Sequence, residues 1–432
     1  MSPVSLNDDV LLLVVACLDP LDALRLSETS RHLHLIALPQ ALSAVTLTGH
    51  VELTAFCRSM LSRPSIHILL VRRLRIALTD NNFSSAPLLA DVLQRAGRLR
   101  SIIMLQSENF IEAEPRIGDA LAALEELEVV YLLGCHERVR EMLHRLRSRP
   151  RKVILSSSPP YPHLVLYLSR LSALQHTVKL GLSKVTVKDE PPPGELAGQL
   201  QAQWDAQYLS LWDAEIPVSF FSSKVPKLRA VVLRQSNITV PASSLPGTAT
   251  FLPLRTVRHM TLDMSWIDVD TTEADVVRAL QPLQCMPPVA LSVQAGVNST
   301  HYLWERLAAF GTQIKYLDVD LNCVQREARS LFIYFLCTVP QLLTPLNIVC
   351  FRISARSMSD EVIQKVLQLH IPSLRYLAVK SSHWYMNEQT DSGAYTLWSA
   401  EGPGDARLFV KMPPETGEAI HERFCSVALE EI

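Results

Sequence analysis

The sequence lacks the cysteine spacing of a disulfide framework or a structural zinc site. Its 8 cysteines lie far apart along 432 residues, and no Cys-x-x-Cys pair occurs. Disulfide-rich secreted domains and zinc sites depend on closely spaced cysteines. We therefore expect free, mostly buried thiols in a reducing compartment, which predicts a cytoplasmic or nuclear protein.

An excess of charge of either sign is also missing. Lys and Arg number 41, Asp and Glu number 43, and the formal net charge is −2. Nucleic acids and anionic lipid surfaces are recognised largely through an excess of basic residues. We expect no nucleic acid and no membrane among the partners.

No apolar run reaches the roughly 18 residues that a transmembrane helix needs. The run Val10–Leu18 has the length of a signal-peptide core, and a loose lipoprotein-like box ends at Cys17. However, no Lys or Arg precedes Arg25, and Asp8 and Asp9 place negative charge where a signal needs positive charge. An exported lipoprotein is therefore the less favoured interpretation.

Motifs of catalytic machinery are absent as well. The sequence contains no GxSxG, HExxH or phosphate-loop motif, and Gly402-Pro403-Gly404 lacks the lysine that a phosphate loop requires. Cys135 and His136 are adjacent and cannot form a nucleophile–base pair without distant partners. We expect no catalytic residue, no metal ligand and no cofactor, and thus a protein that is not an enzyme.

The apolar run near the start is better explained by short helices. Asn7 or Asp8 can cap a first helix, because a short polar side chain accepts the free N–H groups of the first turn. Asp19 followed by Pro20 is a cap with proline at the first helical position, which starts a second helix.

Ser27 is the predicted cap of a third helix, and Pro39 its predicted end. A unit of about 40 residues is too small to bury so much apolar surface alone. It must pack either against the rest of the chain or against a partner.

Three segments of this unit resemble the F-box, a family of short helical domains. They are LNDDVL (6–11), LDPLDALRL (18–26) and SRHL (30–33), and Asn7 stands where the family usually has proline. The resemblance covers about residues 4–45 and implies docking to the Skp-type adaptor of a cullin ubiquitin ligase. The positions that match the apolar docking residues are Leu6, Val10, Leu11, Val14, Pro20, Leu21 and Leu24.

From about residue 50 onward the chain repeats an amphipathic helix, a polar turn and a strand of alternating apolar residues. The strands centre near residues 76, 103, 129, 154, 179, 231, 262, 291, 318, 348 and 377, and a degenerate unit is expected around 208–212. Repeats of roughly 20–30 residues with one strand and one helix are typical of leucine-rich-repeat solenoids.

Residues 314–322 approximate the leucine-rich pattern LxxLxLxxN. The fold class predicted is thus α/β: a three-helix F-box-like unit at 1–45, then an irregular leucine-rich-repeat-like solenoid at 46–384. A flat, doubly wound parallel sheet is the alternative, although no glycine-rich phosphate turn supports it. A hairpin and a closing helix at 385–432 are expected to cap the solenoid.

One face of the repeated strands is expected to line the concave surface, where solenoids bind their partners. Asp318 and Asp320 share this face because side chains alternate along a strand. Solvated strand residues are the plain alternative to a recognition strip. The candidate substrate-binding positions are Arg75, Glu128, Lys179, Asp263, Asp318, Asp320 and Lys380.

The function predicted from these patterns is non-catalytic. The chain would be the substrate-recognition subunit of a cullin-type ligase, with a Skp-type adaptor, a cullin scaffold and an unknown substrate protein as partners. The alternative is a leucine-rich-repeat scaffold whose N-terminal helices only cap it.

Overall fold

The structure is a computed structural model. It describes residues 7–419 except 63–65, 79, 159–162, 168–170, 189–202, 218–219, 222–224, 240–256, 268–269, 297–300, 323–327, 357–365, 367–370, 383–395, 402–407, 414 and 417–418. The chain divides into two compact units, Met1–Trp204 (unit 1) and Asp205–Ile432 (unit 2).

Unit 1 begins with three helices, α1 (Asp8–Ala16), α2 (Pro20–Ser27) and α3 (Arg31–Ser43). Pro39 lies inside α3, so the prediction that it ends the helix was wrong. The turn after it is held by packing, since Leu38 and Ala41 are buried. The amide Nε2 of Gln40 also donates to the Leu18 carbonyl at 2.8 Å. These contacts offset the hydrogen bond that proline cannot make.

Strands and helices then alternate through the rest of unit 1. The elements are β1 (Ala44–Leu47), α4 (His50–Ser62), α5 (Ile66–Leu70), β2 (Arg73–Ile76), α6 (Ala86–Arg95), β3 (Ser101–Met104), α7 (Ser107–Ala113), α8 (Arg116–Ala123), β4 (Val129–Leu133), α9 (Glu137–His144), β5 (Lys152–Ser156), β6 (Leu164–Tyr167), the 3-10 helix η2 (Ser172–His176), β7 (Lys179–Ser183) and β8 (Val185–Lys188). The predicted strands near residues 76, 103, 129, 154 and 179 are confirmed.

The main strands of unit 1, β1 to β5 and β7, pair in parallel in chain order. In β2 to β5 every second side chain is buried, and the buried positions of neighbouring strands are in register. One such row consists of Leu74, Ile102, Val130, Val153 and Leu180, none more than 2% exposed. This row is part of the continuous core of unit 1.

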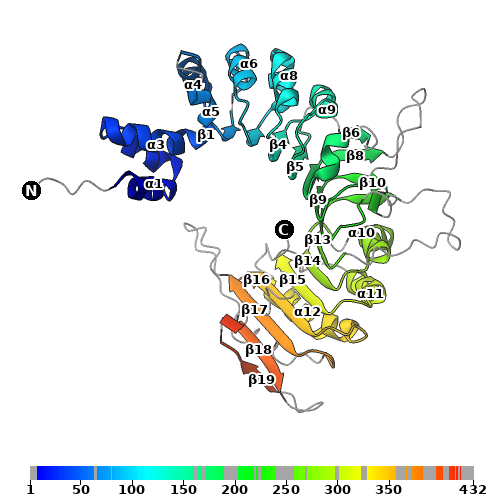
Figure 1. Ribbon diagram of the computed structural model, residues 1–432. Coiled ribbons are helices and arrows are strands. Elements are labelled where there is room, and N and C mark those ends of the chain that lie inside the picture. Colours follow the sequence, from blue (N-terminus) through cyan, green and yellow to red (C-terminus); the bar gives the residue numbers. More distant parts are fainter. Residues whose placement is uncertain are drawn as a thin grey trace, which may run out of the picture. The chain divides into compact units, whose positions relative to one another are not determined.

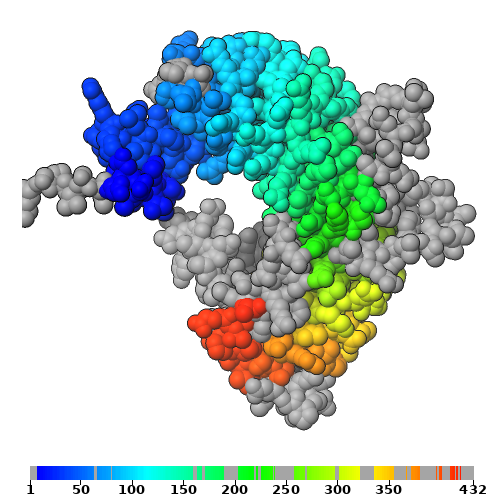
Figure 2. All heavy atoms as spheres, viewed as in Figure 1, coloured from blue at the N-terminus to red at the C-terminus, as the bar shows by residue number. Residues whose placement is uncertain are grey.

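The helices that connect the main strands of unit 1 lie on one face of these strands (Figure 1). Figure 1 shows α4, α6, α8 and α9 side by side on that face, and α4 packs on α6, α6 on α8 and α8 on α9. In the space-filling view, successive segments from blue to teal lie against one another in chain order (Figure 2). We call the opposite side of the strands the open face of unit 1.

Unit 2 repeats the pattern with longer strands. Its elements are β9 (Tyr208–Trp212), β10 (Glu215–Pro217), β11 (Ala230–Arg234), β12 (Asn237–Thr239), β13 (His259–Met264), α10 (Glu273–Cys285), β14 (Ala290–Gly296), α11 (His301–Phe310), β15 (Tyr316–Asn322), α12 (Ala328–Leu343), β16 (Cys350–Arg356), β17 (Tyr376–Ser382), β18 (Thr396–Glu401) and β19 (Leu408–Lys411). The degenerate strand predicted at 208–212 is confirmed as β9.

Parallel pairing joins β9, β11 and β13 to β17, and the buried row Met260, Leu291, Leu317, Phe351 and Leu377 runs through the last five of these strands. The predicted hairpin is also confirmed, because β18 and β19 pair antiparallel after β17. The closing helix predicted beyond it falls largely outside the described residues.

A further set of short strands was not predicted. In unit 1, β6 pairs with β8, and in unit 2, β10 pairs with β12, all in parallel. Each of β8, β10 and β12 follows a main strand after a sharp corner. The corners are built on Lys184, Asp213 and Gln235, whose φ angles are 53°, 50° and 49°. Left-handed backbone at a non-glycine residue redirects the chain abruptly at a local energetic cost.

Candidate functional site

The N-terminal helices are positioned by polar caps. The side chain of Asn7 accepts from the Asp9 amide at 3.3 Å, and that of Asp19 accepts from the Asp22 amide at 2.9 Å. Both caps were predicted. The third prediction was wrong, since Ser30 and not Ser27 caps α3. Ser27 ends α2, where its hydroxyl donates to the Leu24 carbonyl at 2.7 Å.

Helix α1 exposes most of its apolar side chains. Val15 is its only buried residue. Val10 is 42% exposed and Val14 is 46% exposed, and both were predicted docking residues. Leu12 and Leu13, which were not among the predicted docking residues, are 52% and 70% exposed. Val10, Leu13 and Val14 lie three and four positions apart and share one face of α1, which we call the α1 patch. Leu12 projects from the opposite face.

The remaining predicted docking residues lie in three settings. Leu11 and Pro20 are half-buried. Leu21 and Leu24, both exposed, line a hollow of about 740 Å³ between α2, α3, α4 and strands β1 to β3. Leu6 lies outside the described residues. The structure thus separates an exposed group on α1 from a second group that faces the first strands.

A polar contact joins the first and third helices. The Nε2 atom of His32 lies 2.9 Å from Oδ1 of Asp8, and both side chains are more than half exposed. The contact fixes the start of α1 against the start of α3.

The candidate strand positions of unit 1 differ in phase. Arg75 and Lys179 point to the open face as expected, because their strand neighbours Leu74 and Leu180 are buried. Glu128 precedes β4, whose outward residues are Val129 and Tyr131. The expected phase was therefore off by one residue at β4.

Three of the four candidate positions of unit 2, Asp263, Asp320 and Lys380, fall on one registered row. Asp263 pairs with Gln294, Gln294 with Asp320, Asp320 with Ser354, and Ser354 with Lys380. The Ser354 hydroxyl donates to Oδ1 of Asp320 at 2.8 Å. Period-two phasing thus placed these positions correctly on adjacent strands.

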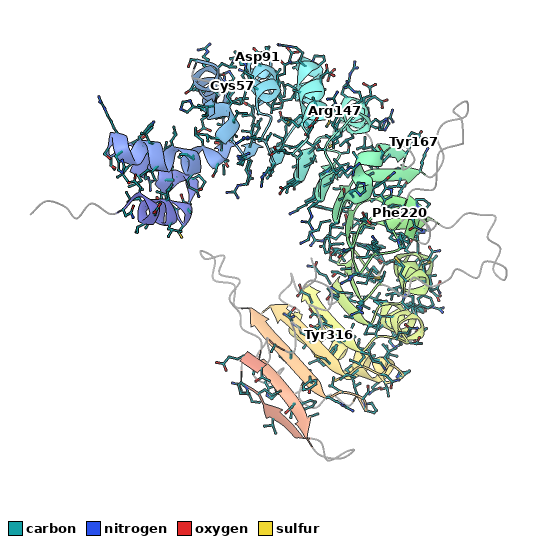
Figure 3. The ribbon with its side chains drawn as sticks, in the orientation of Figure 1. Cys57, Asp91, Arg147, Tyr167, Phe220 and Tyr316 are labelled. Atoms are coloured by element: carbon teal, nitrogen blue, oxygen red, sulfur yellow. The ribbon has the colours of Figure 1, made fainter. Side chains whose placement is uncertain are left out.

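Asp318 lies on the next row and is drawn into an ion pair. Its Oδ2 atom is 3.8 Å from an Nη1 of Arg352, and the two side chains are only 20% and 11% exposed. The same guanidinium nitrogen donates to the Tyr316 hydroxyl at 3.4 Å. Tyr316, which is labelled on β15 in Figure 3, is itself 1% exposed. Asp318 therefore supports the sheet more than it offers a free carboxylate.

His259 belongs to the same half-buried polar region. Its Nε2 lies 3.0 Å from the Ser292 hydroxyl, and burial lowers the pKa of its imidazole. Desolvation disfavours the charged ring. This arrangement favours a neutral, hydrogen-bonded histidine.

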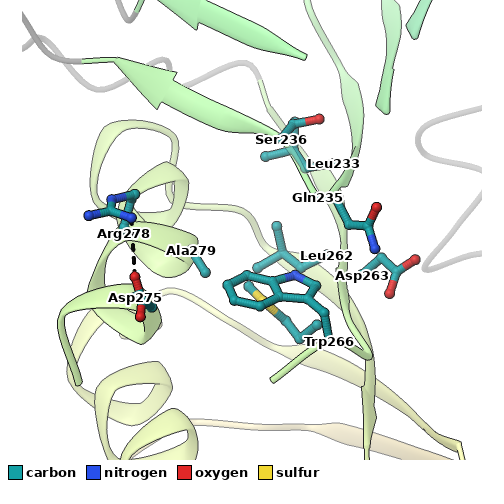
Figure 4. Close-up of a pocket in the computed structure, with 10 residues that line it drawn as sticks. Leu233, Gln235, Ser236, Leu262, Asp263, Trp266, Asp275, Arg278 and Ala279 are labelled. Carbon is teal, nitrogen blue, oxygen red and sulfur yellow. Dashed lines mark hydrogen bonds and ion pairs between the residues drawn. The ribbon is translucent and has the colours of Figure 1, made fainter. Parts of the chain in front are cut away.

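A small hollow opens where β11 and β13 meet α10. It has a volume of about 350 Å³, and Leu233, Leu262 and Trp266 are among the residues that line it (Figure 4). Asp275 and Arg278 on α10 form an ion pair at 3.1 Å beside it. Trp266 is 39% exposed. Asp263, a candidate substrate-binding residue, also lines this hollow.

Two buried thiols, those of Cys57 and Cys135, are poor nucleophiles at neutral pH. Burial raises the pKa of Cys57 to about 12, with a smaller contribution from the Asp91 carboxylate on the neighbouring helix (Figure 3). Burial likewise raises the pKa of Cys135 to about 12. A thiol of such high pKa holds almost no thiolate at neutral pH, and the thiolate is the nucleophile.

Among the described residues, no helix has the length and apolarity needed to cross a bilayer. Within the same part of the chain, no group of three or more His, Cys, Asp and Glu side chains is placed to hold a metal ion. Comparison of the sequence with models of known protein families finds no match, and a search of curated proteins also finds no similar protein.

Proposed function

We propose that this protein is the non-catalytic substrate-recognition subunit of a cullin-type ubiquitin ligase. In this proposal α1 to α3 form an F-box-like unit that docks a Skp-type adaptor. The repeated strands and helices form a leucine-rich-repeat-like solenoid that holds a target protein. The chain contributes proximity, and the transfer of ubiquitin takes place on other subunits.

The α1 patch is the observation that carries the proposal. Helix α1 has nine residues and buries only Val15, so packing against the rest of the chain stabilises it little. Exposed apolar clusters of this kind mark surfaces where another protein binds. Val10 and Val14 of the patch coincide with docking positions implied by the F-box resemblance.

Two features of the strands support the solenoid. The described helices that connect β1 to β5 pack on only one face of these strands (Figure 1). A doubly wound sheet, in contrast, has helices on both faces. The corners at Lys184, Asp213 and Gln235 also recur at the same place after successive main strands. A recurring corner is what stacked repeats of one supersecondary unit produce.

A second function, that of a plain scaffold, is favoured by one observation. Helix α3 packs against α5 and β1, and the Ser43 carbonyl at its end accepts from the Arg72 amide at 3.1 Å. The helical unit thus leads directly into β1, the first strand of the repeated part, which is where a cap lies in a solenoid.

Co-purification separates the two functions. We expect the full chain to retain a co-expressed Skp-type adaptor, and Val10→Asp with Val14→Asp to lose it. Val51→Asp is the matched control, because Val51 is 74% exposed on α4. The scaffold function is favoured instead if no adaptor is retained, or if the double variant retains as much as the control.

A further inference from the structure

The open face of unit 1 carries charge of one sign. The outward positions of its main strands are Ala44, Thr46, Arg73, Arg75, Ser101, Ile103, Val129, Tyr131, Leu133, Lys152, Ile154, Ser156, Lys179, Gly181 and Ser183. All of these strands are described in full, and none of these positions holds Asp or Glu. A chain of net charge −2 thus presents a purely cationic strip here.

The cations of this strip have no ion-pair partner among the described residues. Arg73, Arg75 and Lys152 are exposed, and Lys179 is half-buried. The arginines just outside the strip behave differently. Arg100, for example, lies 3.6 Å from Glu128. Glu126 and Glu128 thus neutralise part of the rim, and no acidic residue among those described pairs with the cations of the strip itself.

An apolar segment lies between the cations. Ile103, Tyr131 and Ile154 are registered neighbours on β3, β4 and β5, and all three are partly exposed. Arg75 on β2 extends the same row. Strands lie about 4.8 Å apart, so β2 is separated from β5 and β7 by about 14 and 19 Å. The strip is thus cationic at both ends and apolar in the middle.

We propose that this strip binds an extended acidic segment of a partner protein, with apolar residues between two acidic ends. At about 3.3 Å per residue, four to six extended residues span the distance between the cations. Carboxylates at one end would meet Arg73 and Arg75, and those at the other Lys152 and Lys179. The inference rests on the proposed function only in that the bound protein would be the ligase target.

The chemistry of the strip favours a peptide over a nucleic acid. Two of the three side chains in its middle are aliphatic isoleucines, whereas proteins that bind single strands interleave cations with aromatic stacking platforms.

Peptide arrays test the inference on the purified full chain, without any adaptor. The probes are octapeptides with acidic residues at both ends and apolar residues between them. Matched arrays carry Asn and Gln, or Lys and Arg, at the ends. We expect selective binding of the acidic set that weakens as NaCl is raised, because exposed charges are screened. Equal binding of the neutral or basic sets overturns the inference, as does no binding.

Charge reversal locates the binding. For Arg73→Glu with Arg75→Glu, we expect affinity for the best acidic peptide to fall at least about tenfold. The matched control is Arg58→Glu with Arg95→Glu, an equal charge change at exposed positions of α4 and α6, and it should bind as the wild type does. Equal losses in both variants overturn the inference.

Two further measurements make the test decisive. A single-stranded oligonucleotide that binds as tightly as the peptide, and is lost in the same variant, overturns the inference in favour of a nucleic acid. Adaptor co-purification should be unchanged by the Arg73 and Arg75 reversal. If the chain binds the adaptor but no acidic peptide, this inference fails and the proposed function stands. If the chain binds the peptide but no adaptor, the proposed function fails and this inference stands.

Discussion

Glu108 is a buried carboxylate whose loss should destabilise unit 1. It is 3% exposed at the start of α7, and its carboxylate accepts three backbone N–H groups at the start of α9. The donors are the amides of His136, Arg138 and Val139, at 2.8, 2.7 and 3.1 Å. The first N–H groups of a helix have no partner within it, and a negative charge there also complements the helix dipole.

Glu108→Gln keeps the shape of the side chain but removes its charge. The glutamine has a single acceptor oxygen, and its NH₂ group faces backbone N–H groups that also need an acceptor. A hydrogen bond to a charged group contributes about 1.5–3 kcal/mol. We therefore expect the free energy of unfolding to fall by about 2–3 kcal/mol, and by about 3–5 kcal/mol for Glu108→Ala. For a unit of this size, the Gln variant should lower Tm by roughly 4–12 °C.

Urea unfolding followed by circular dichroism measures the loss, and hydrogen exchange at residues 136–139 localises it. Glu112→Gln is the matched control, because Glu112 is an exposed residue of the same helix. It should change stability by less than about 0.5 kcal/mol. If the Glu108 and Glu112 variants are equally stable, the carboxylate does not hold α9.

Two more predictions concern the thiols and the cap of α2. At pH 8, iodoacetamide should label the exposed Cys17 and Cys337 in the native chain, whereas Cys57 and Cys135 should react only after unfolding. Because the unfolded thiols have a pKa of 9.0 and these two buried thiols about 12, their contribution to stability should decline as the pH rises above 9.0. Rapid native labelling of either buried thiol, seen by mass spectrometry, would refute the burial. Asp19→Ala should lower the free energy of unfolding by about 1 kcal/mol, measured by urea unfolding. Asp19→Asn should lower it much less, because asparagine can also cap the helix. If the two variants lose equal stability, the hydrogen bond of the cap does not stabilise α2.

The sequence patterns predicted most of the main strands, although not β1, and two of the three caps at the N-terminal helices. Period-two alternation located β13 to β17 and the row through Asp263 and Asp320, because one face of each strand must be buried. Asn7 and Asp19 were predictable caps, since the signal is local. The same phasing could have found Arg73 and Lys152, which lie on the open face beside the chosen candidates.

Other features depend on contacts distant in sequence. Glu108 caps a helix from 28 or more residues away, and no local pattern marks it. The corners at Lys184 and Gln235 have positive φ at residues other than glycine. Without a glycine the sequence shows no turn at these positions, and the short strands that follow were therefore not predicted. Asp318 looked like a free carboxylate because Arg352, its partner, lies on the next strand.

The central claim is that the N-terminal helices dock a Skp-type adaptor, and titration calorimetry with the two purified proteins tests it most directly. We expect the wild-type chain to bind with a Kd of about 1 μM or tighter. Val10 and Val14 are 42% and 46% exposed, so burying each contributes about 1 kcal/mol, and aspartate adds the desolvation of a charge. The double Asp variant should therefore bind at least about 100-fold more weakly, whereas Val51→Asp should match the wild type. An absence of binding by the wild type, or an equal Kd for the double variant, would contradict the account.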